Sequence, residues 1–239
     1  MKFYDLHLQS NLSEGENSIE EMVRIAEKLG YSGIAICDTY QGKGKIDELK
    51  KAIKEVETEI GVYPGVNIKA KDVNELKEII SKVREKVLVV VVSGGNYNIN
   101  RAACEDSRVD ILAHPESGRI DSGLDQVCLE ASARNNVRIQ INFREILYSF
   151  RRPRSYILNH ITKNIRLADH FRTPVIICSG AQSTWDMRSP RELVSIANVL
   201  GLDLGKAFQG VTSVPQQIIE NNKKVLEGEK ITEGVEIVE

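Results

Sequence analysis

The sequence has 239 residues, of which 41% are hydrophobic and 28% charged, and its formal net charge is −2. These values are typical of a globular protein with length for one large or two small domains, and they exclude a polycation. The longest apolar run, Val87 to Val92, is too short to span a bilayer, and Asp5 and His7 interrupt the first apolar run where a signal peptide would be continuous, so we expect no membrane association.

The first half of the chain alternates short β-branched runs with stretches of helical periodicity. Ser18 and Glu21 have the spacing of a capping box, so we expect a helix to begin after Ser18. Asp72 is the expected cap of a later helix. The expected strands are Phe3–Leu8, Gly33–Cys37, Val62–Lys69 and Val87–Val92, and the expected helices are Ile19–Leu29, Ile46–Ile60, a helix from Asp72 through Val83, and Asn98–Ser107.

The second half continues the alternation. The expected strands are Asp110–Ala113, Val137–Asn142 and Pro174–Cys178, and the expected helices are Leu124–Asn135, Arg154–Phe171, Pro190–Leu200 and Pro215–Leu226. We expect residues 1–228 to form one domain and residues 229–239 to form an acidic tail. About seven strand–helix units predict a parallel α/β fold, either a closed TIM-like barrel or an open doubly wound sheet.

The four cysteines lie far apart and form no CxxC pair. A disulfide framework or a zinc site is therefore not expected. Reduced, buried thiols are usual in the cytoplasm, which is the location that we expect.

Polar residues gather where the expected strands end. Asp5 and His7 end the first strand, Asp38 follows the second and His114 follows the fifth. In a barrel these ends form one rim, where functional sites are built. Turn formation and hydrogen-bonded core histidines are the alternative interpretation of the same residues.

These strand ends resemble the motifs of the polymerase and histidinol phosphatase family of metal-dependent phosphoesterases. That family opens with Asp-Leu-His-x-His-Ser, where this chain has Asp-Leu-His-Leu-Gln-Ser at residues 5–10, and Ala113-His114-Pro115 also fits. Amides, hydroxyls or glycine replace the ligands that the resemblance places at Gln9, Thr39, Asn67, Gly180 and Gln182.

Amides and hydroxyls bring no charge to a metal cluster, and glycine brings no side-chain ligand. We therefore expect no metal bound by this chain and no catalytic residue in it. The residues that survive are expected to be remnants of a degenerate site: Asp5, His7, Asp38 and His114.

Longer stretches resemble the ribonuclease P protein component 3 family of archaea and eukaryotes. The most specific are Ile-Asn-Phe-Arg at 141–144, Ser-Gly-Ala at 179–181 and Met-Arg-Ser-Pro at 187–190, and the likeness runs from about residue 2 to 226. The resemblance implies an irregular TIM-like barrel of about seven β/α units. It also implies a subunit of the ribonucleoprotein that removes 5′ leaders from precursor tRNA.

In that assembly the RNA is the catalyst, so the resemblance implies that this chain alone is not catalytic and binds no cofactor. The Mg²⁺ of the holoenzyme is expected to act through the RNA. The implied partners are the RNase P RNA, precursor tRNA, a smaller subunit with an RRM-like fold and other RNase P proteins. Two alternatives stay open: a free-standing metal-dependent phosphoesterase that uses His7, Asp38 and His114, and a barrel that binds only protein.

The charge distribution agrees with RNA binding. From Arg138 to Arg191 the chain has nine arginines and Lys163 against three acidic residues, a local charge of +7. Arginines interleaved with aromatic residues, as in 148–156, can bind phosphates and stack on bases. A solvated basic loop or internal ion pairs are the alternative. The expected RNA contacts are Lys43, Lys45, Lys69, Arg101, Arg119, Arg144, Arg151, Arg152, Arg154 and Arg188.

Two further expectations concern local structure. Lys43 and Lys45 alternate with glycines, so we expect them in a loop before a helix. Leu193, Ile196, Ala197 and Leu200 form an apolar stripe that at this spacing is more often core than interface, although the last two helices stay candidates for a protein interface.

Overall fold

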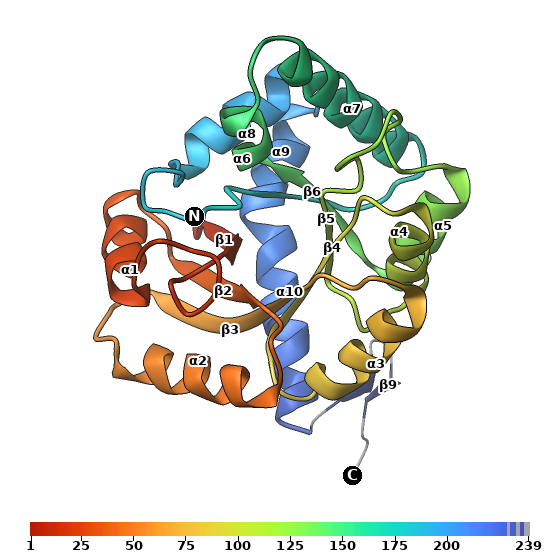
Figure 1. Cartoon of the computed structure of the whole chain (residues 1–239). Coiled ribbons are helices and arrows are strands. Elements are labelled where there is room, and N and C mark those ends of the chain that lie inside the picture. Colours follow the sequence, from red (N-terminus) through yellow and green to blue (C-terminus); the bar gives the residue numbers. More distant parts are fainter. Residues whose placement is uncertain (229, 233–234, 237–239) are drawn as a thin grey trace.

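Seven parallel strands form one sheet that curves into a nearly closed barrel in the computed structural model of the chain (Figure 1). The strands neighbour one another in chain order, and each is followed by at least one helix. The structure describes residues 1–228, 230–232 and 235–236. The barrel strands are β1 (Tyr4–Leu8), β2 (Gly33–Thr39), β3 (Gly61–Ile68), β4 (Val89–Ser93), β5 (Ile111–Ala113), β6 (Arg138–Asn142) and β7 (Val175–Cys178).

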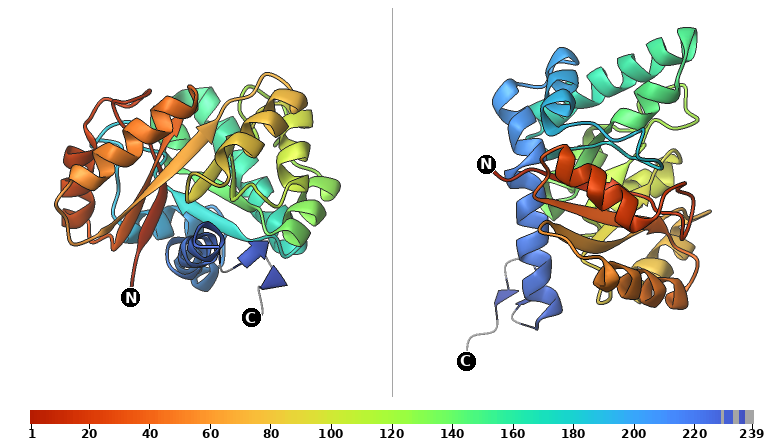
Figure 2. Two further views of the ribbon diagram at one scale, coloured as in Figure 1. Left: turned by 90° about the horizontal axis from the view of Figure 1, so that it is seen from below. Right: turned by 90° about the vertical axis from the view of Figure 1, so that its left-hand side faces the viewer.

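Helices surround the barrel and cover one end of it (Figures 1 and 2). They are α1 (Ile19–Lys28), α2 (Lys43–Glu55), α3 (Val73–Val83), α4 (Tyr97–Glu105), α5 (Gln126–Asn135), α6 (Phe143–Tyr148), α7 (Arg151–His170), α8 (Pro190–Val199), α9 (Leu204–Val211) and α10 (Ser213–Leu226). The expected acidic tail at 229–239 lies partly outside the described residues, and within it β8 (Lys230–Thr232) and β9 (Val235–Glu236) pair antiparallel.

The sequential strand order confirms the TIM-like barrel. A doubly wound sheet reverses its strand order at a switch point, and this sheet does not. All seven expected strands are present, and Ser18 forms the expected capping box with Glu21. Helices α6 and α9 have no counterpart among the expected elements. The first is only 6 residues long and the second contains Gly205 and Gly210, so neither gives a strong helical pattern.

Two basic segments are helical where a loop was expected. Helix α2 begins at Lys43, directly after Gly42 with its φ of 107°, so Lys43 and Lys45 lie in its first turn. Helix α7 begins at Arg151 rather than Arg154, so all the arginines of that segment lie in its first turn. Glycine has a low helix propensity, and positive charges are unfavourable near the N-terminal end of a helix. The tertiary fold therefore outweighs both effects at the starts of α2 and α7.

The apolar stripe of α8 confirms the core interpretation. Leu193 and Ala197 are buried in one cluster with residues of β6, β7 and α7. Helix α10 lies across the end of the barrel where the strands begin (Figure 2). There the Asn222 amide donates to the carbonyl of Leu88 and to Asp110, both at 2.8 Å.

No helix among the described residues is long and apolar enough to cross a membrane. The four cysteines are free thiols, and each is buried.

Candidate functional site

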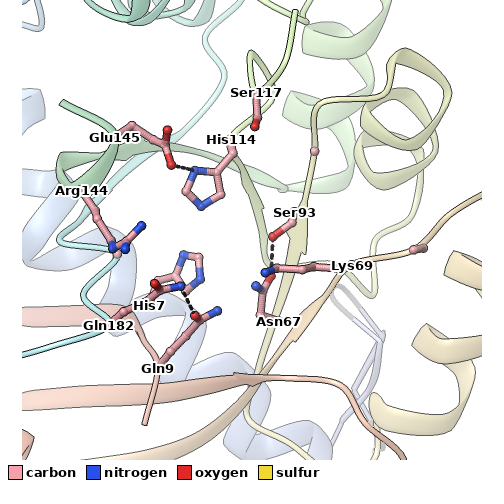
Figure 3. Close-up of a pocket in the computed structure, with 13 residues that line it drawn as sticks. His7, Gln9, Asn67, Lys69, Ser93, His114, Ser117, Arg144, Glu145 and Gln182 are labelled. Carbon is pink, nitrogen blue, oxygen red and sulfur yellow. Dashed lines mark hydrogen bonds and ion pairs between the residues drawn. The ribbon is translucent and has the colours of Figure 1, made fainter. Parts of the chain in front are cut away.

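The carboxyl ends of the strands surround a polar pocket of about 370 Å³ (Figure 3). Parallel strands of a barrel all end on this side, so residues far apart in sequence meet there. Of the residues predicted from sequence, His7, Lys69, His114 and Arg144 line the pocket. The other lining residues are Gln9, Asn67, Ala70, Ser93, Gly94, Ser117, Glu145, Gly180 and Gln182.

Asp5 and His7 on β1 are buried and serve the structure around them. The backbone N–H of Ser179 donates to Asp5 at 3.0 Å and that of His7 donates at 3.3 Å, which ties β1 to the end of β7. Burial raises the pKa of Asp5 to about 6. Burial also lowers the pKa of His7 to about 3, and the Nδ1 atom of its neutral ring lies 2.9 Å from Oε1 of Gln140.

His114 is held on the rim by two neighbours from the next strand–helix unit. Its Nε2 atom lies 3.1 Å from the amide nitrogen of Asn142, and its Nδ1 atom lies 3.2 Å from Oε1 of Glu145. The contact with His114 lowers the pKa of Glu145. The His7 and His114 rings meet edge to face at 5.9 Å, so both histidines already have polar or aromatic neighbours.

Three of the positions where the phosphoesterase pattern has metal ligands form hydrogen bonds across the rim. The Gln182 amide donates to the side-chain oxygen of Gln9 at 2.7 Å, and the Ser93 hydroxyl donates to Asn67 at 2.8 Å (Figure 3). At Gly180, where φ is 65°, an added Cβ would lie 2.4 Å from the Asn142 amide. The rim therefore has no room for an acidic side chain at this position.

Asp38 is used for loop structure. Its carboxylate accepts hydrogen bonds from the backbone N–H of Ser10 at 2.7 Å and from the hydroxyls of Ser10 and Ser13 at 2.7 and 2.8 Å. Burial nevertheless raises its pKa. Within the described part of the chain, no three His, Cys, Asp or Glu side chains are grouped to hold a metal ion. The donor set at this rim does not fit the metal cluster of a phosphoesterase.

The ten predicted RNA contacts fall into two groups. Five of them form ion pairs with carboxylates, and two of these pairs span only one helical turn, as in Arg101 with Glu105. A cation that is already paired has less charge to offer a phosphate. The paired residues are Lys45 with Glu48, Lys69 with Glu14, Arg101 with Glu105, Arg119 with Asp121 and Arg144 with Asp186.

The other five form no ion pair with a carboxylate among residues 1–228, 230–232 and 235–236. They are Lys43, Arg151, Arg152, Arg154 and Arg188. Arg154 and Arg188 instead donate to backbone carbonyls, those of Ser149 at 2.6 Å and Trp185 at 2.7 Å.

Arg144 and four of these five cations belong to α6, to the first turn of α7 and to the segment before α8. The Tyr148 hydroxyl of α6 donates to Asp186 at 2.8 Å, and the Arg188 guanidinium lies 5.0 Å from the ring centre of Phe143. These contacts join α6 to the segment before α8, which run side by side in Figure 1. We name this surface the arginine edge, and its residues are Arg144, Arg151, Arg152, Arg154 and Arg188.

Two residues of this region, Glu145 and Trp185, were not among the predicted site residues, whereas Asn142 belongs to the motif quoted from the sequence. Asn142 and Glu145 hold His114, and Trp185 stands exposed beside the arginine edge. Asn142 and Glu145 flank the Phe-Arg of the Ile-Asn-Phe-Arg motif, and Trp185 is the single tryptophan of the chain. A search for charged residues next to the motif would have found Glu145.

The fold and rim define a TIM-like barrel whose rim, within the described residues, groups no three His, Cys, Asp or Glu side chains that could hold a metal ion. A crystal structure of histidinol phosphate phosphatase from Lactococcus lactis has the same fold, with a TM-score of 0.56 at 12% identity, covering 84% of this chain and 95% of that one. At that identity the similarity concerns the fold alone.

Sequence comparison is more specific. The profile of the RNase P subunit p30 family matches residues 2–225. The chain is 34% identical over 238 residues to Ribonuclease P protein component 3 of Methanosarcina barkeri, covering 100% of this chain and 96% of that one. It is 35% identical to the same component of Methanosarcina mazei, covering 99% of this chain and 98% of that one.

A solved structure agrees with these relatives. A chain in the cryo-EM structure of archaeal Ribonuclease P with mature tRNA matches with a TM-score of 0.80 and 26% identity, covering 98% of each chain. The chain belongs to the RNase P p30 family, the protein subunits of ribonuclease P.

Proposed function

We propose that the chain supports ribonuclease P by binding RNA along the arginine edge, while its rim pocket carries out no chemistry. The observation that carries this proposal is the set of arginines without carboxylate partners. Arg151, Arg152, Arg154 and Arg188 form no ion pair among the described residues, whereas the cations elsewhere on the rim mostly do. Unpaired cations release the most counterions on binding phosphates.

Arg151, Arg152 and Arg154 lie in the first turn of α7, and this position argues for a function other than stability. The N-terminal end of a helix carries partial positive charge, so a basic first turn is unfavourable and acidic residues are preferred. Helix α7 has no acidic residue in its first turn, and Phe150 at its N-cap makes no side-chain cap. A phosphate placed there would satisfy both the free N–H groups and the arginines.

Aromatic rings keep the arginine edge ordered. The guanidinium of Arg144 lies 4.3 Å from the ring centre of Tyr148, and that of Arg154 lies 5.3 Å from Phe150. Stacking fixes the plane of a guanidinium, and the N–H groups that are not bonded to Asp186 or to the Ser149 carbonyl stay available at its edge. Ordered arginines lose less entropy when they bind a phosphate.

The partners and conditions of this function follow from the family. We propose that the RNA is the RNase P RNA and its precursor tRNA, and that a smaller RRM-like subunit binds elsewhere on the barrel together with other RNase P proteins. The Mg²⁺ of the holoenzyme would act through the RNA, since the donor set of this rim does not fit a metal cluster. The four free thiols support a cytoplasmic location.

The free-standing phosphoesterase finds no support in the donors of the rim, because Gln9 and Gln182 bond to each other and Gly180 leaves no space for a ligand. Reconstitution separates the two functions. Omitting the chain from otherwise complete ribonuclease P should reduce cleavage of precursor tRNA. The purified chain with Mg²⁺ or Mn²⁺ should cleave neither precursor tRNA nor a simple phosphomonoester. Turnover by the chain alone, abolished by a chelator, would decide for the phosphoesterase.

A further inference from the structure

One indole stands in solvent beside the arginine edge. Trp185 is the only tryptophan in the sequence, and 85% of it is exposed. Tryptophan is on average a well-buried residue, because its large ring gains much from leaving water. This exposure is therefore a cost to the isolated subunit, and it leaves the flat face of the indole open to contact with another molecule.

The backbone on both sides of Trp185 is held in place. The N–H of Thr184 donates to the side chain of Asn17 at 2.9 Å, and the carbonyl of Trp185 accepts from Arg188 at 2.7 Å. Buried Asp186, which is 1% exposed, accepts from the N–H groups of Gln182 and Ser183, both at 3.1 Å. The indole is thus presented by an ordered segment, which reduces the entropy lost on binding.

The groups around Trp185 suit a nucleotide. Arg188, three residues on, makes no carboxylate ion pair among the described residues, and its guanidinium lies over Phe143. Tyr148 on α6 is 53% exposed and bonds to Asp186, next in sequence to Trp185. Aromatic faces for bases with arginines for phosphates are the two components of single-strand recognition. A protein partner would instead have to bring many acidic residues to this strongly basic surface.

We propose that Trp185 stacks on an unpaired base of an RNA strand whose phosphates lie along the arginine edge. This inference rests on the proposed RNA-binding function and adds to it a preference for single-stranded over double-stranded RNA. Bases inside an A-form duplex are already stacked on one another and do not reach a protein ring.

Because Trp185 is the only tryptophan, fluorescence excited at a wavelength that the seven tyrosines do not absorb reports on this residue alone. Unstructured oligouridylate should quench most of the Trp185 emission as it binds. A blunt RNA duplex should change the emission little when the same fraction of the protein is bound to it as to oligouridylate. The bound fraction is measured by the fluorescence anisotropy of a labelled RNA strand. Quenching by both RNAs alike, or oligouridylate occupancy without quenching, would overturn the inference and leave RNA binding intact.

Variants test the same point through affinity. Trp185→Ala should weaken oligouridylate binding by about 5- to 150-fold without changing its salt dependence, the range expected for one stacked base. Trp185→Phe should retain most of the affinity. The matched control is Val199→Ala on α8, where an 84% exposed apolar residue has no role in this proposal and should leave binding unchanged.

Three outcomes are decisive. Unchanged affinity of Trp185→Ala would refute the stacking role. A change in Trp185 emission caused by the other RNase P proteins but not by RNA would assign the indole to a protein interface and refute the inference. Failure of oligouridylate and of RNase P RNA to bind the intact chain would refute the proposed function itself.

Discussion

Replacing the two exposed arginines that open α7 should weaken RNA binding without destabilising the protein. Arg151 and Arg152 are exposed and have no carboxylate partner among the described residues. Each phosphate contact contributes a slope of about 0.7 in log affinity against log salt for a single strand, so losing two contacts lowers the slope by about 1.4. At about 0.1 M salt, relative to about 1 M, this corresponds to an affinity loss of about 25-fold.

The variant Arg151→Gln with Arg152→Gln should be measured by anisotropy titrations with RNase P RNA fragments at several salt concentrations. Its melting temperature should be unchanged or slightly higher, because two positive charges leave the N-terminal end of a helix. The control is Arg101→Gln with Arg119→Gln, which removes the same net charge from residues that are ion-paired to Glu105 and Asp121. Equal losses of affinity and slope in both double variants would show that only net charge matters and would refute the reasoning.

The remaining predictions concern stability and metals. Arg84→Met should lower the free energy of unfolding, measured by urea denaturation, by about 3–5 kcal/mol. The reason is that it breaks a buried ion pair with Asp110, in which the two side chains are 12% and 7% exposed. A loss below about 1 kcal/mol, the value for a surface ion pair, would contradict this prediction. Gly180→Ala should cost about 1–3 kcal/mol, because φ is 65° and the new Cβ would meet Asn142; a melting temperature equal to that of the parent would be inconsistent with this geometry. On acidification from pH 6.5 toward pH 4, the parent should lose more stability than His7→Gln. The folded pKa of His7, about 3, lies below its ordinary 6.5, so the unfolded chain takes up the extra proton in this window; parallel stability curves would argue against a buried neutral His7. Prolonged chelation should leave the melting temperature unchanged, and a fall that a divalent metal restores would support the phosphoesterase.

The barrel itself could be predicted because local signals and tertiary structure agree. Val89 to Val92 form a continuous apolar and buried run in β4, as expected for a strand buried on both faces, and Ser18 and Asp72 cap the helices that they were expected to cap. The starts of α2 and α7 could not be predicted, because Gly42, Gly44 and a cluster of arginines disfavour a helical first turn unless the rest of the fold imposes it.

The structure brings His7, Lys69, His114 and Arg144 together at one pocket on the rim, but the ion pairs of the cations could not be predicted. Sequence places Lys69 near a strand end, yet its carboxylate partner, Glu14, is 55 residues away in sequence, so this pair could not be predicted. The exposure of Trp185 is likewise set by the tertiary position of its segment, since the residues on either side of it are held by Asn17 and by Tyr148.

The most direct test is ultraviolet crosslinking of reconstituted ribonuclease P, followed by mass spectrometry of the peptides of this chain that carry nucleotides. RNA binding along the arginine edge predicts crosslinks within residues 143–156 and 183–191, and their loss in the variant with Arg151→Gln and Arg152→Gln. Crosslinks confined to α2, α3 or α4, or unchanged in that variant, would contradict the assignment of the RNA-binding surface.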